Sequence, residues 1–138
     1  MERTLIIVKP EAVAKKLAGR IFSVYEDNHL DIIHAHKVLA PKDVLEKHYA
    51  NLKDEPYFND VVAYMSSSEV IVAILEGENA VSVVRELNGA TNPEKSKAGS
   101  LRYMYGTSLR QNAVHGSESV EAANNEILIW KNLLNYED

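Results

Sequence analysis

The hydrophobic positions of the first thirty residues change from a continuous run to a helical spacing. Leu5–Val8 is an unbroken apolar run, rich in β-branched residues and stopped by Pro10, which predicts a buried strand. Apolar residues then recur at every fourth position, which predicts one amphipathic helix from Glu11 to Asn28-His29. These residues are Val13, Leu17, Ile21 and Tyr25.

The middle of the chain predicts a second strand followed by a pair of helices. Residues 31–39 form the strand, and Pro41 is placed to begin a short helix. A second apolar cluster after Pro56 has helical spacing, so the two segments resemble a helical hairpin.

The last part of the chain combines regular elements with one long polar stretch. Residues 70–75 are the clearest strand, and a helix over about 80–87 is closed by Gly89. A last strand is predicted at 127–130. Residues 90–113 exceed the roughly 12 to 15 residues above which an irregular loop is usually functional, so a site is expected there.

This order of elements predicts an α+β fold within a single domain, residues 1–138. It fits a ferredoxin-like split βαβ sandwich, with a four-stranded, mainly antiparallel sheet and helices packed on one of its faces.

Charge and composition narrow the classes of partner. With 15 Lys and Arg against 20 Asp and Glu, the net charge of -5 predicts no general attraction to nucleic acid or membrane, so any anion site must be local. The chain contains no cysteine, which favours a reducing cytoplasm and excludes thiolate metal sites. The first apolar run is too short for a signal or membrane segment.

Among five histidines, His115 stands out because Gly116 follows it in a polar segment. Neutral imidazole is nucleophilic near pH 7, and glycine leaves space for a bulky partner. A His-Gly pair alone does not distinguish a nucleophile from a packed histidine. His34 and His36 share a strand face, where a solvated face is favoured over a metal site, and His29 and His48 look incidental.

Cations near the long loop suggest an anion site. Lys9 follows the first strand, Arg85 lies on the helix before the loop, and Arg102 and Arg110 lie within it. Guanidinium and ammonium groups that converge stabilise a transferring phosphoryl group. Substitution of Arg102 by Ala would then slow turnover and leave the fold intact.

Other residue types complete a possible nucleotide site. Thr91 offers a hydroxyl at the loop entrance, and Tyr49 and Tyr57 offer flat faces for a base, with core packing as the alternative. Glu126 would orient an imidazole, with an exposed carboxylate as the commoner alternative, and Ser117 would add a hydrogen bond. No G-x-x-x-x-G-K-[ST], H-R-D or D-F-G motif is present, which excludes P-loop and protein-kinase phosphate sites.

Three segments together resemble the nucleoside diphosphate kinase family, over residues 2 to about 130. The segment 112–119, Asn-Ala-Val-His-Gly-Ser-Glu-Ser, resembles the family's active-site signature. Residues 89–93 resemble its nucleotide-binding loop, and residues 7–11 match its first strand and lysine.

The resemblance implies a ping-pong reaction in which His115 takes the γ-phosphate of a Mg²⁺-bound nucleoside triphosphate and returns it to a diphosphate. It implies that Glu126 orients His115, that Ser117 is its partner and that Tyr57 stacks on the base. It also implies a homo-oligomer, tetramer or hexamer, with Mg²⁺ held mainly by nucleotide phosphates and not by protein side chains. The implied phosphate and ribose contacts are Lys9, Tyr49, Arg85, Thr91, Arg102 and Asn112.

Several positions depart from the family pattern without removing a catalytic group. Tyr57 stands where Phe is common, Glu55 where a basic residue is frequent, and Ser68-Glu69 where Gly-Pro is common. Ala98 replaces a common proline, and Met104 replaces a common acidic residue. Base stacking, loop rigidity and subunit contacts are the properties that these changes affect.

Two alternatives come from other classes of protein. A non-catalytic split βαβ module that senses a small anion would not need His115. A phosphohistidine carrier that exchanges phosphate with another protein would use His115 but not Tyr57 or the cation cluster.

Overall fold

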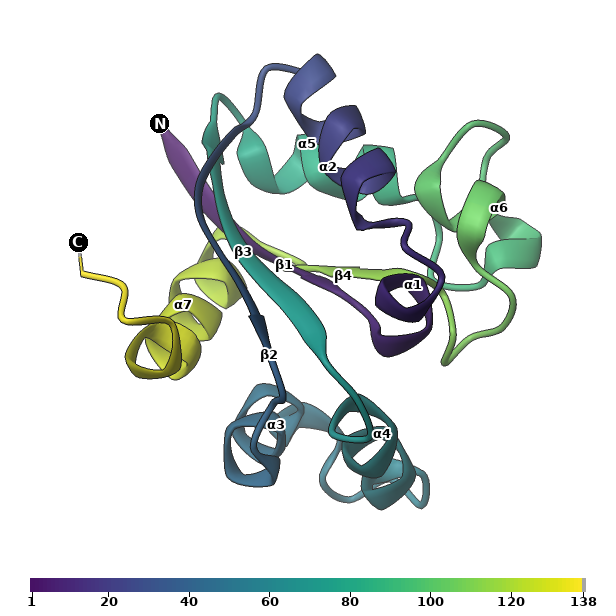
Figure 1. The fold of residues 1–138 in the computed structure, drawn as a ribbon, viewed down its shortest axis with the longest axis vertical. Helices are drawn as coiled ribbons and strands as arrows, with labels where there is room; N and C mark the ends of the chain where they lie inside the picture. The colour runs from purple at the N-terminus through teal and green to yellow at the C-terminus, as the bar shows by residue number, and fades with distance from the viewer. Residues whose placement is uncertain (138) are drawn as a thin grey trace.

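The computed structural model describes residues 1–137. Its centre is a four-stranded sheet (Figure 1). The strands lie in the order β2-β3-β1-β4, and each neighbouring pair is antiparallel. This confirms the predicted split βαβ architecture. The strands are β1 (Glu2–Val8), β2 (Asp31–Val38), β3 (Val70–Gly77) and β4 (Val114–Gly116).

Helices connect the strands as two interleaved βαβ units. β1 and β2 both pair antiparallel with β3, so they run parallel and need a crossover, which α1 (Pro10–Ala14) and α2 (Ala18–Asp27) supply. In the same way α5 (Ala80–Asn88) connects β3 to β4. The last strand therefore returns beside β1, which places its residues next to the end of the first strand.

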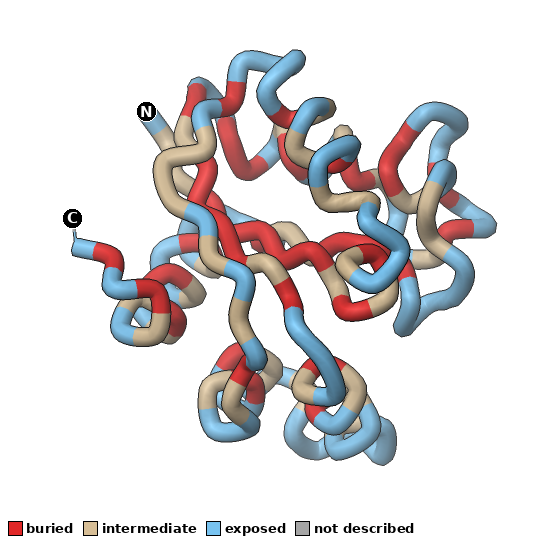
Figure 2. The backbone as a smooth tube through the Cα atoms, viewed as in Figure 1, coloured by how far each residue is buried: buried red, intermediate tan, exposed pale blue. Residues whose placement is uncertain are grey.

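The helices cover both faces of the sheet, so the prediction of one covered face is wrong. α1, α2 and α5 pack on one face with Ile6 and Val8, whereas Leu5 and Ile7 face the other. That second face is covered by α3 (Lys42–His48), α4 (Phe58–Met65) and α7 (Val120–Leu134). Because β1 is central, its alternate residues enter two apolar cores, which explains its continuous hydrophobic run (Figure 2).

The predicted helix from Glu11 to Asn28 is two helices. Lys16 has φ of 61°, a left-handed conformation that breaks the helix between α1 and α2. The predicted end is confirmed, since α2 stops at Asp27 and His29 has φ of 66°.

The predicted strand at 127–130 is wrong, because these residues lie within α7. Ser119 caps that helix by accepting a hydrogen bond from the backbone N–H of Ala122 at 3.0 Å. Its buried residues recur at spacings of three and four, a helical period that the β-branched appearance of the segment obscured. They are Ala123, Ile127, Trp130 and Leu134.

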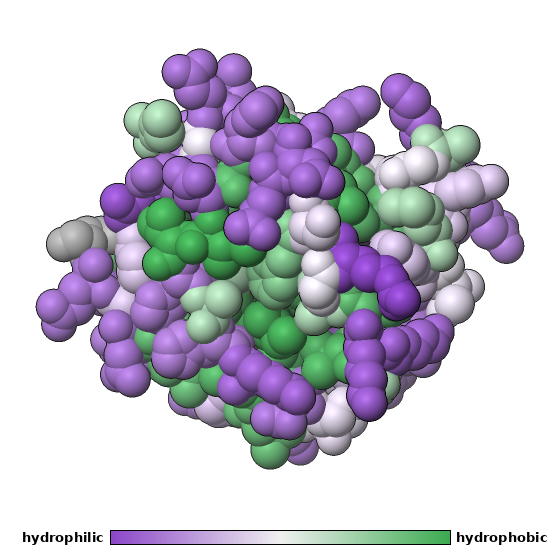
Figure 3. All heavy atoms as spheres, turned by 45° about the horizontal axis from the view of Figure 1, so that its top comes forward, coloured by the Kyte–Doolittle hydropathy of each residue, from purple (hydrophilic) through white to green (hydrophobic). Residues whose placement is uncertain are grey.

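The long stretch 90–113 is not a free loop. It contains the 3₁₀ helix Pro93–Lys95 and the short helix α6 (Leu101–Tyr105), which the Ser100 side chain caps by accepting from the N–H of Tyr103. A second 3₁₀ helix, Ala50–Leu52, joins α3 to α4. Figure 3 shows one outer face, where polar side chains lie over much of the surface and apolar ones are visible between them. No helix within residues 1–137 has both the length and the apolar character needed to cross a bilayer.

Candidate active site

A cavity of about 1270 Å³ collects the predicted site residues in one place. Its walls come from the α3–α4 hairpin, the end of α5, the 90–112 segment and α7. Every predicted site residue lines it except Ser117, which is buried behind His115. The lining members are Lys9, Tyr49, Tyr57, Arg85, Thr91, Arg102, Asn112, His115 and Glu126.

The charge of the cavity is opposite to that of the whole chain. Three carboxylates lie among its lining residues, Glu86, Glu118 and Glu126. Seven cationic side chains outnumber them, which makes a local anion site in a chain of net charge -5. These cations are Lys9, Lys47, Arg85, Lys95, Lys97, Arg102 and Arg110.

Sheet pairing brings His115 and Lys9 together. His115 on β4 pairs with Ile7 on β1, and Lys9 follows two residues after Ile7. The backbone N–H of Lys9 donates to the carbonyl of Ala113 at 2.9 Å, which joins the two segments just beyond the paired region. The predicted nucleophile on β4 and the predicted phosphate-binding lysine, directly after β1, therefore lie close together.

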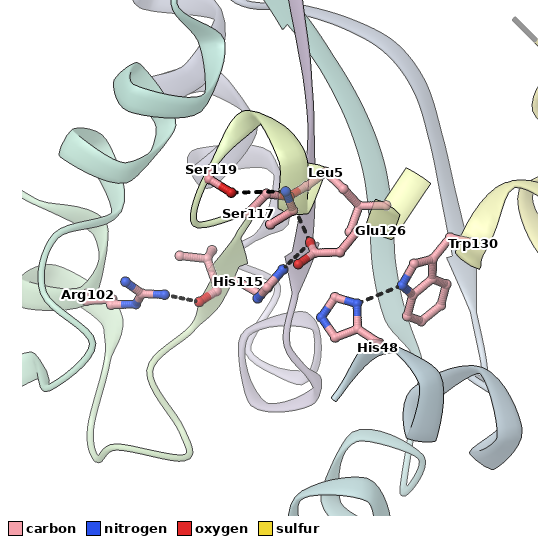
Figure 4. A network of polar contacts seen from close by, with 10 residues as sticks. Leu5, His48, Arg102, His115, Ser117, Ser119, Glu126 and Trp130 are labelled. Carbon is pink, nitrogen blue, oxygen red and sulfur yellow. Dashed lines mark hydrogen bonds and ion pairs between the residues drawn. The ribbon is translucent and has the colours of Figure 1, made fainter. Parts of the chain in front are cut away.

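His115 is held through one ring nitrogen. Its Nε2 lies 2.8 Å from Oε1 of Glu126, and the Ser117 hydroxyl donates to the same oxygen at 2.7 Å (Figure 4). An ionised carboxylate only accepts, so Nε2 carries the proton and the lone pair of His115 is on Nδ1. The arrangement presents Nδ1 as the free, nucleophilic nitrogen.

The state of Glu126 supports this assignment. Burial raises the pKa of its carboxyl, but the hydrogen bonds from His115 and Ser117 and the electrostatic effect of the two neighbouring imidazoles, His115 and His48, lower it more, and the net pKa is below its ordinary value. The Glu126 carboxylate is therefore ionised at neutral pH and acts as the acceptor.

Lys9 is a cation whose charge is easily lost. Burial and the neighbouring charge of Arg102 lower the pKa of its ammonium to about 8, against a smaller opposing effect of Glu11. Its Nζ also donates to the carbonyl of Arg110 at 3.3 Å. A bound polyanion would favour the charged form.

Arg102 has a structural role in addition to its place in the cavity. Its two terminal nitrogens donate to the carbonyls of Gly89 at 2.7 Å and Val114 at 2.9 Å, and its Nε is buried without a protein partner. Burial lowers its pKa, as does the charge of Arg85. Arg102 therefore joins the end of α5 to β4, so its removal is expected to lower stability as well as turnover.

The loop residues are fixed by side-chain contacts to backbone. Asn112 is buried and donates from Nδ2 to the carbonyl of Thr91 at 2.9 Å, while its Oδ1 is buried without a protein partner. Arg85 is exposed, and its guanidinium donates to the carbonyl of Glu118 at 3.2 Å. Tyr49 is half-buried at the end of α3, and Tyr57 is 42% exposed at the start of α4.

Gly116 is required because a side chain at this position would not fit, and not because the backbone turns sharply there. A Cβ atom there would lie 2.8 Å from Nδ2 of Asn88 and 2.9 Å from Cγ1 of Val84. Glycine thus lets β4 approach α5 closely and sets the depth at which His115 sits.

His48 looks incidental in the sequence, but in the structure it lines the cavity beside His115. It is buried, its ring centroid lies 4.5 Å from that of His115, and the two rings meet edge to face at 73°. Trp130 Nε1 donates to His48 Nδ1 at 3.0 Å. The signal was available only from α7, because the helical spacing of Glu126 and Trp130 places both on the face that meets these rings.

Glu11 was also missed. Its Oε2 accepts from the backbone N–H of Ala113 at 2.8 Å, and its Oε1 accepts from the Tyr64 hydroxyl at 2.6 Å. Ala113 has φ of 76°, unusual for a residue with a Cβ, and its two backbone groups are held by Glu11 and Lys9. This clamp fixes the backbone two residues before His115.

The described residues contain one grouping with metal-ligand geometry, formed by His48, His115 and Glu126. Two imidazoles and one carboxylate do not fit Mg²⁺, which prefers an octahedron of oxygens. His34 and His36 are not part of this grouping. Their rings stack at 4.7 Å, and His34 Nε2 lies 2.6 Å from the carbonyl of Leu134, so His34 contacts the end of α7 rather than forming a solvated strand face.

Comparison with protein families adds an independent finding. The model of the family described as nucleoside diphosphate kinase matches residues 2–133. A nucleoside diphosphate kinase of a Nitratiruptor species is 49% identical over 130 residues, covering 94% of this chain and 95% of the relative. One of Clostridium perfringens is 41% identical over 138 residues, covering 100% of this chain and 96% of the relative.

Solved structures agree with the sequence comparison. The apo nucleoside diphosphate kinase of Encephalitozoon cuniculi superposes with a TM-score of 0.92 at 39% identity, covering 94% of this chain and 88% of that one. The Aquifex aeolicus nucleoside diphosphate kinase gives 0.89 at 37% identity, covering 93% of both chains.

Proposed function

The chain belongs to the nucleoside diphosphate kinase family, and from this premise we propose that His115 is the residue that carries the phosphate. Enzymes of this family transfer the γ-phosphate of a nucleoside triphosphate to a nucleoside diphosphate, reversibly and in a ping-pong sequence through a phosphohistidine. The observation that supports His115 is its free Nδ1, which follows from the bond between Nε2 and Glu126.

The first half-reaction forms one bond and breaks one. The Nδ1 lone pair of His115 attacks the γ-phosphorus, an N–P bond forms, and the bond between the γ-phosphorus and the bridging oxygen breaks. Its electron pair remains on the β-phosphate of the departing diphosphate. Nε2 keeps its proton, so the phosphorylated ring is positively charged, and the Glu126 carboxylate stabilises that charge. The second half-reaction is the reverse with another diphosphate.

The remaining residues of the cavity bind and orient the nucleotide in this proposal. Lys9, Arg85 and Arg102 surround the phosphates with positive charge, which stabilises the charge on the equatorial oxygens of the transferring group. Tyr57, at the exposed rim, stacks on the base, and a π-face contact accepts any base. The unpartnered Oδ1 of Asn112 and the hydroxyls of Thr91 and Tyr49 offer further contacts to phosphate and ribose.

Mg²⁺ enters with the nucleotide in this proposal, because the His-Glu grouping does not suit it. It would be held by phosphate oxygens and water, and it would neutralise phosphate charge. We also propose a homo-oligomer, tetramer or hexamer, in the cytoplasm, on the basis of the family resemblance and the absence of cysteine. Light scattering tests the first of these and cell fractionation the second.

The experiment that tests the proposed function follows labelled phosphate through both half-reactions. Purified protein incubated with γ-³²P-ATP is expected to yield an acid-labile, base-stable phosphoprotein, which added GDP converts to labelled GTP. His115→Ala is expected to give neither product, and His36→Gln serves as the matched control. Labelling of His115→Ala, or a labelled protein that no diphosphate discharges, would reject the proposal in favour of another acceptor or a phosphocarrier.

A further inference from the structure

His48 lies between Trp130 and His115, and its tautomer is fixed from one side. An indole nitrogen only donates, so His48 Nδ1 must be the acceptor of the 3.0 Å bond from Trp130 Nε1. The proton of the neutral ring is therefore on Nε2. Burial is the largest of the effects that lower the pKa of His48 to about 3; the neighbouring His115 and Lys9 add to it and the Glu126 charge opposes it, so the ring stays neutral at physiological pH.

The Nε2–H of His48 faces the cavity. His48 is one of the cavity's lining residues, and Figure 4 shows its second nitrogen pointing away from Trp130 and toward the side of His115. Its ring centroid is 4.5 Å from that of His115. Within residues 1–137, no protein group binds this nitrogen or His115 Nδ1. The other nitrogen of each ring has a partner, Trp130 for His48 and Glu126 for His115. A fixed donor and a free nucleophilic nitrogen thus share one corner of the cavity.

We propose that His48 is a catalytic residue that donates its Nε2–H to a non-bridging oxygen of the phosphoryl group as that group moves to and from Nδ1 of His115. Trp130 is then a positioning residue, which acts by holding the His48 proton on Nε2. The inference rests on the proposed function of His115 and extends it to a donor that the cationic residues do not supply.

A neutral donor suits this position better than a cation. The ring of His115 becomes positively charged on phosphorylation, and a second positive ring at 4.5 Å would repel it. A neutral N–H stabilises the phosphoryl oxygens without that repulsion, in the manner of neutral imidazoles that act as electrophiles in other enzymes.

The same tautomer disfavours metal binding by the His48, His115 and Glu126 grouping. A metal would need the Nε2 lone pair of His48, which requires the proton to move to Nδ1. Nδ1–H would then face the indole N–H of Trp130, and two donors would oppose each other. The contact with Trp130 therefore favours a hydrogen-bond donor over a ligand.

Two substitutions of His48 distinguish the effect of losing the Nε2–H donor from the effect of losing the packing of the ring. The amide of Gln reaches the position of Nε2, whereas that of Asn reaches only the position of Nδ1, where it can still accept from Trp130. We expect His48→Asn to slow single-turnover phosphorylation at saturating ATP about a hundredfold, as loss of a transition-state donor does, with nucleotide Kd unchanged. His48→Gln should restore the rate to within roughly tenfold of the wild type.

The outcomes distinguish this inference from the proposed function. If the wild type is not labelled on His115, the proposed function itself fails. If the wild type is labelled and His48→Asn reacts at the same rate, or if Asn and Gln lose the same activity, only the role of His48 fails. Circular dichroism of each variant, with His36→Gln as the control, checks that the fold is retained.

The tautomer gives a second readout that a packing role would not change. ¹⁵N NMR of the imidazoles in the wild-type protein should show His48 protonated on Nε2 alone, and Trp130→Phe should give a mixture of tautomers and a slower phosphorylation rate. A wild-type His48 protonated on Nδ1 would overturn the inference whether or not Trp130→Phe folds.

Discussion

Glu126 and Trp130 lie one turn apart on α7, and each fixes the proton of a different imidazole ring. Glu126 binds Nε2 of His115 at 2.8 Å, and Trp130 donates to Nδ1 of His48 at 3.0 Å. The two rings are thereby held in complementary states, one with a free lone pair and one with a free N–H. One face of α7 therefore sets the tautomers of both imidazole rings.

Glu126→Gln should keep the shape of this contact and remove its charge. The amide oxygen can still accept from Nε2–H, but it does not neutralise the positive ring that phosphorylation creates. We expect single-turnover phosphorylation to slow by on the order of a hundredfold, with ATP binding unchanged. Quenched-flow kinetics measure the rate. An unaltered rate would show that the Glu126 charge is not used.

The pH dependence should report Lys9. Its pKa of about 8 means that the free enzyme loses this positive charge as pH rises above 8, whereas below 8 the ammonium is present. Because kcat/KM reports the free enzyme, it should fall through about pH 8, while kcat should hold to higher pH since bound phosphate favours the charged lysine. Lys9→Arg stays charged and is the control. If the alkaline fall persists in Lys9→Arg, another group causes it.

Arg102→Ala should lower both turnover and stability. The substitution removes the bonds to the carbonyls of Gly89 and Val114, which together contribute roughly 1 to 3 kcal/mol to the free energy of unfolding. Turnover should fall on the order of 10²- to 10³-fold through lost charge stabilisation. Chemical denaturation and steady-state kinetics measure the two effects. Arg85→Ala, whose guanidinium makes one exposed contact, should affect stability much less.

Gly116→Ala should disturb the position of His115 through packing alone. Its added methyl would meet Asn88 and Val84 below 3 Å, and overpacking of this kind costs about 1 to 3 kcal/mol in stability. Denaturant unfolding measures the stability, and a slower rate of His115 phosphorylation indicates that the ring has moved. Gly19→Ala, where a Cβ meets nothing within 4 Å, is the matched control. Equal stabilities for the two variants would mean that the close approach of β4 to α5 is not rigid.

The sequence was sufficient for the parts of the fold that local patterns determine. The sequence predicted β1, β3 and α5 from continuous apolar runs and from Pro10 and Gly89. These signals depend only on residues that are neighbours in the sequence. The strand predicted at 127–130 is wrong because the β-branched residues of this short segment are typical of a strand. Only the helical spacing of buried residues from Ala123 to Leu134 identifies the segment as part of α7.

The residues of the candidate site could likewise be predicted where short sequence motifs identify them. Motif resemblance identified His115, Lys9 and the loop residues, and the structure shows that they line one cavity. His48 and Trp130 were not recognisable, because their contact depends on α3 and α7, which are distant in sequence, packing together on one face of the sheet. Nor does sequence show that the Arg102 guanidinium binds two backbone carbonyls.

The most direct test of the central claim identifies the nitrogen that bears the phosphate. In protein labelled with ¹⁵N-histidine and phosphorylated with ATP, a ³¹P–¹⁵N correlation experiment should couple the phosphorus to Nδ1 of His115, with Nε2 still protonated toward Glu126. Coupling to Nε2, or to a nitrogen of His48, would contradict the account.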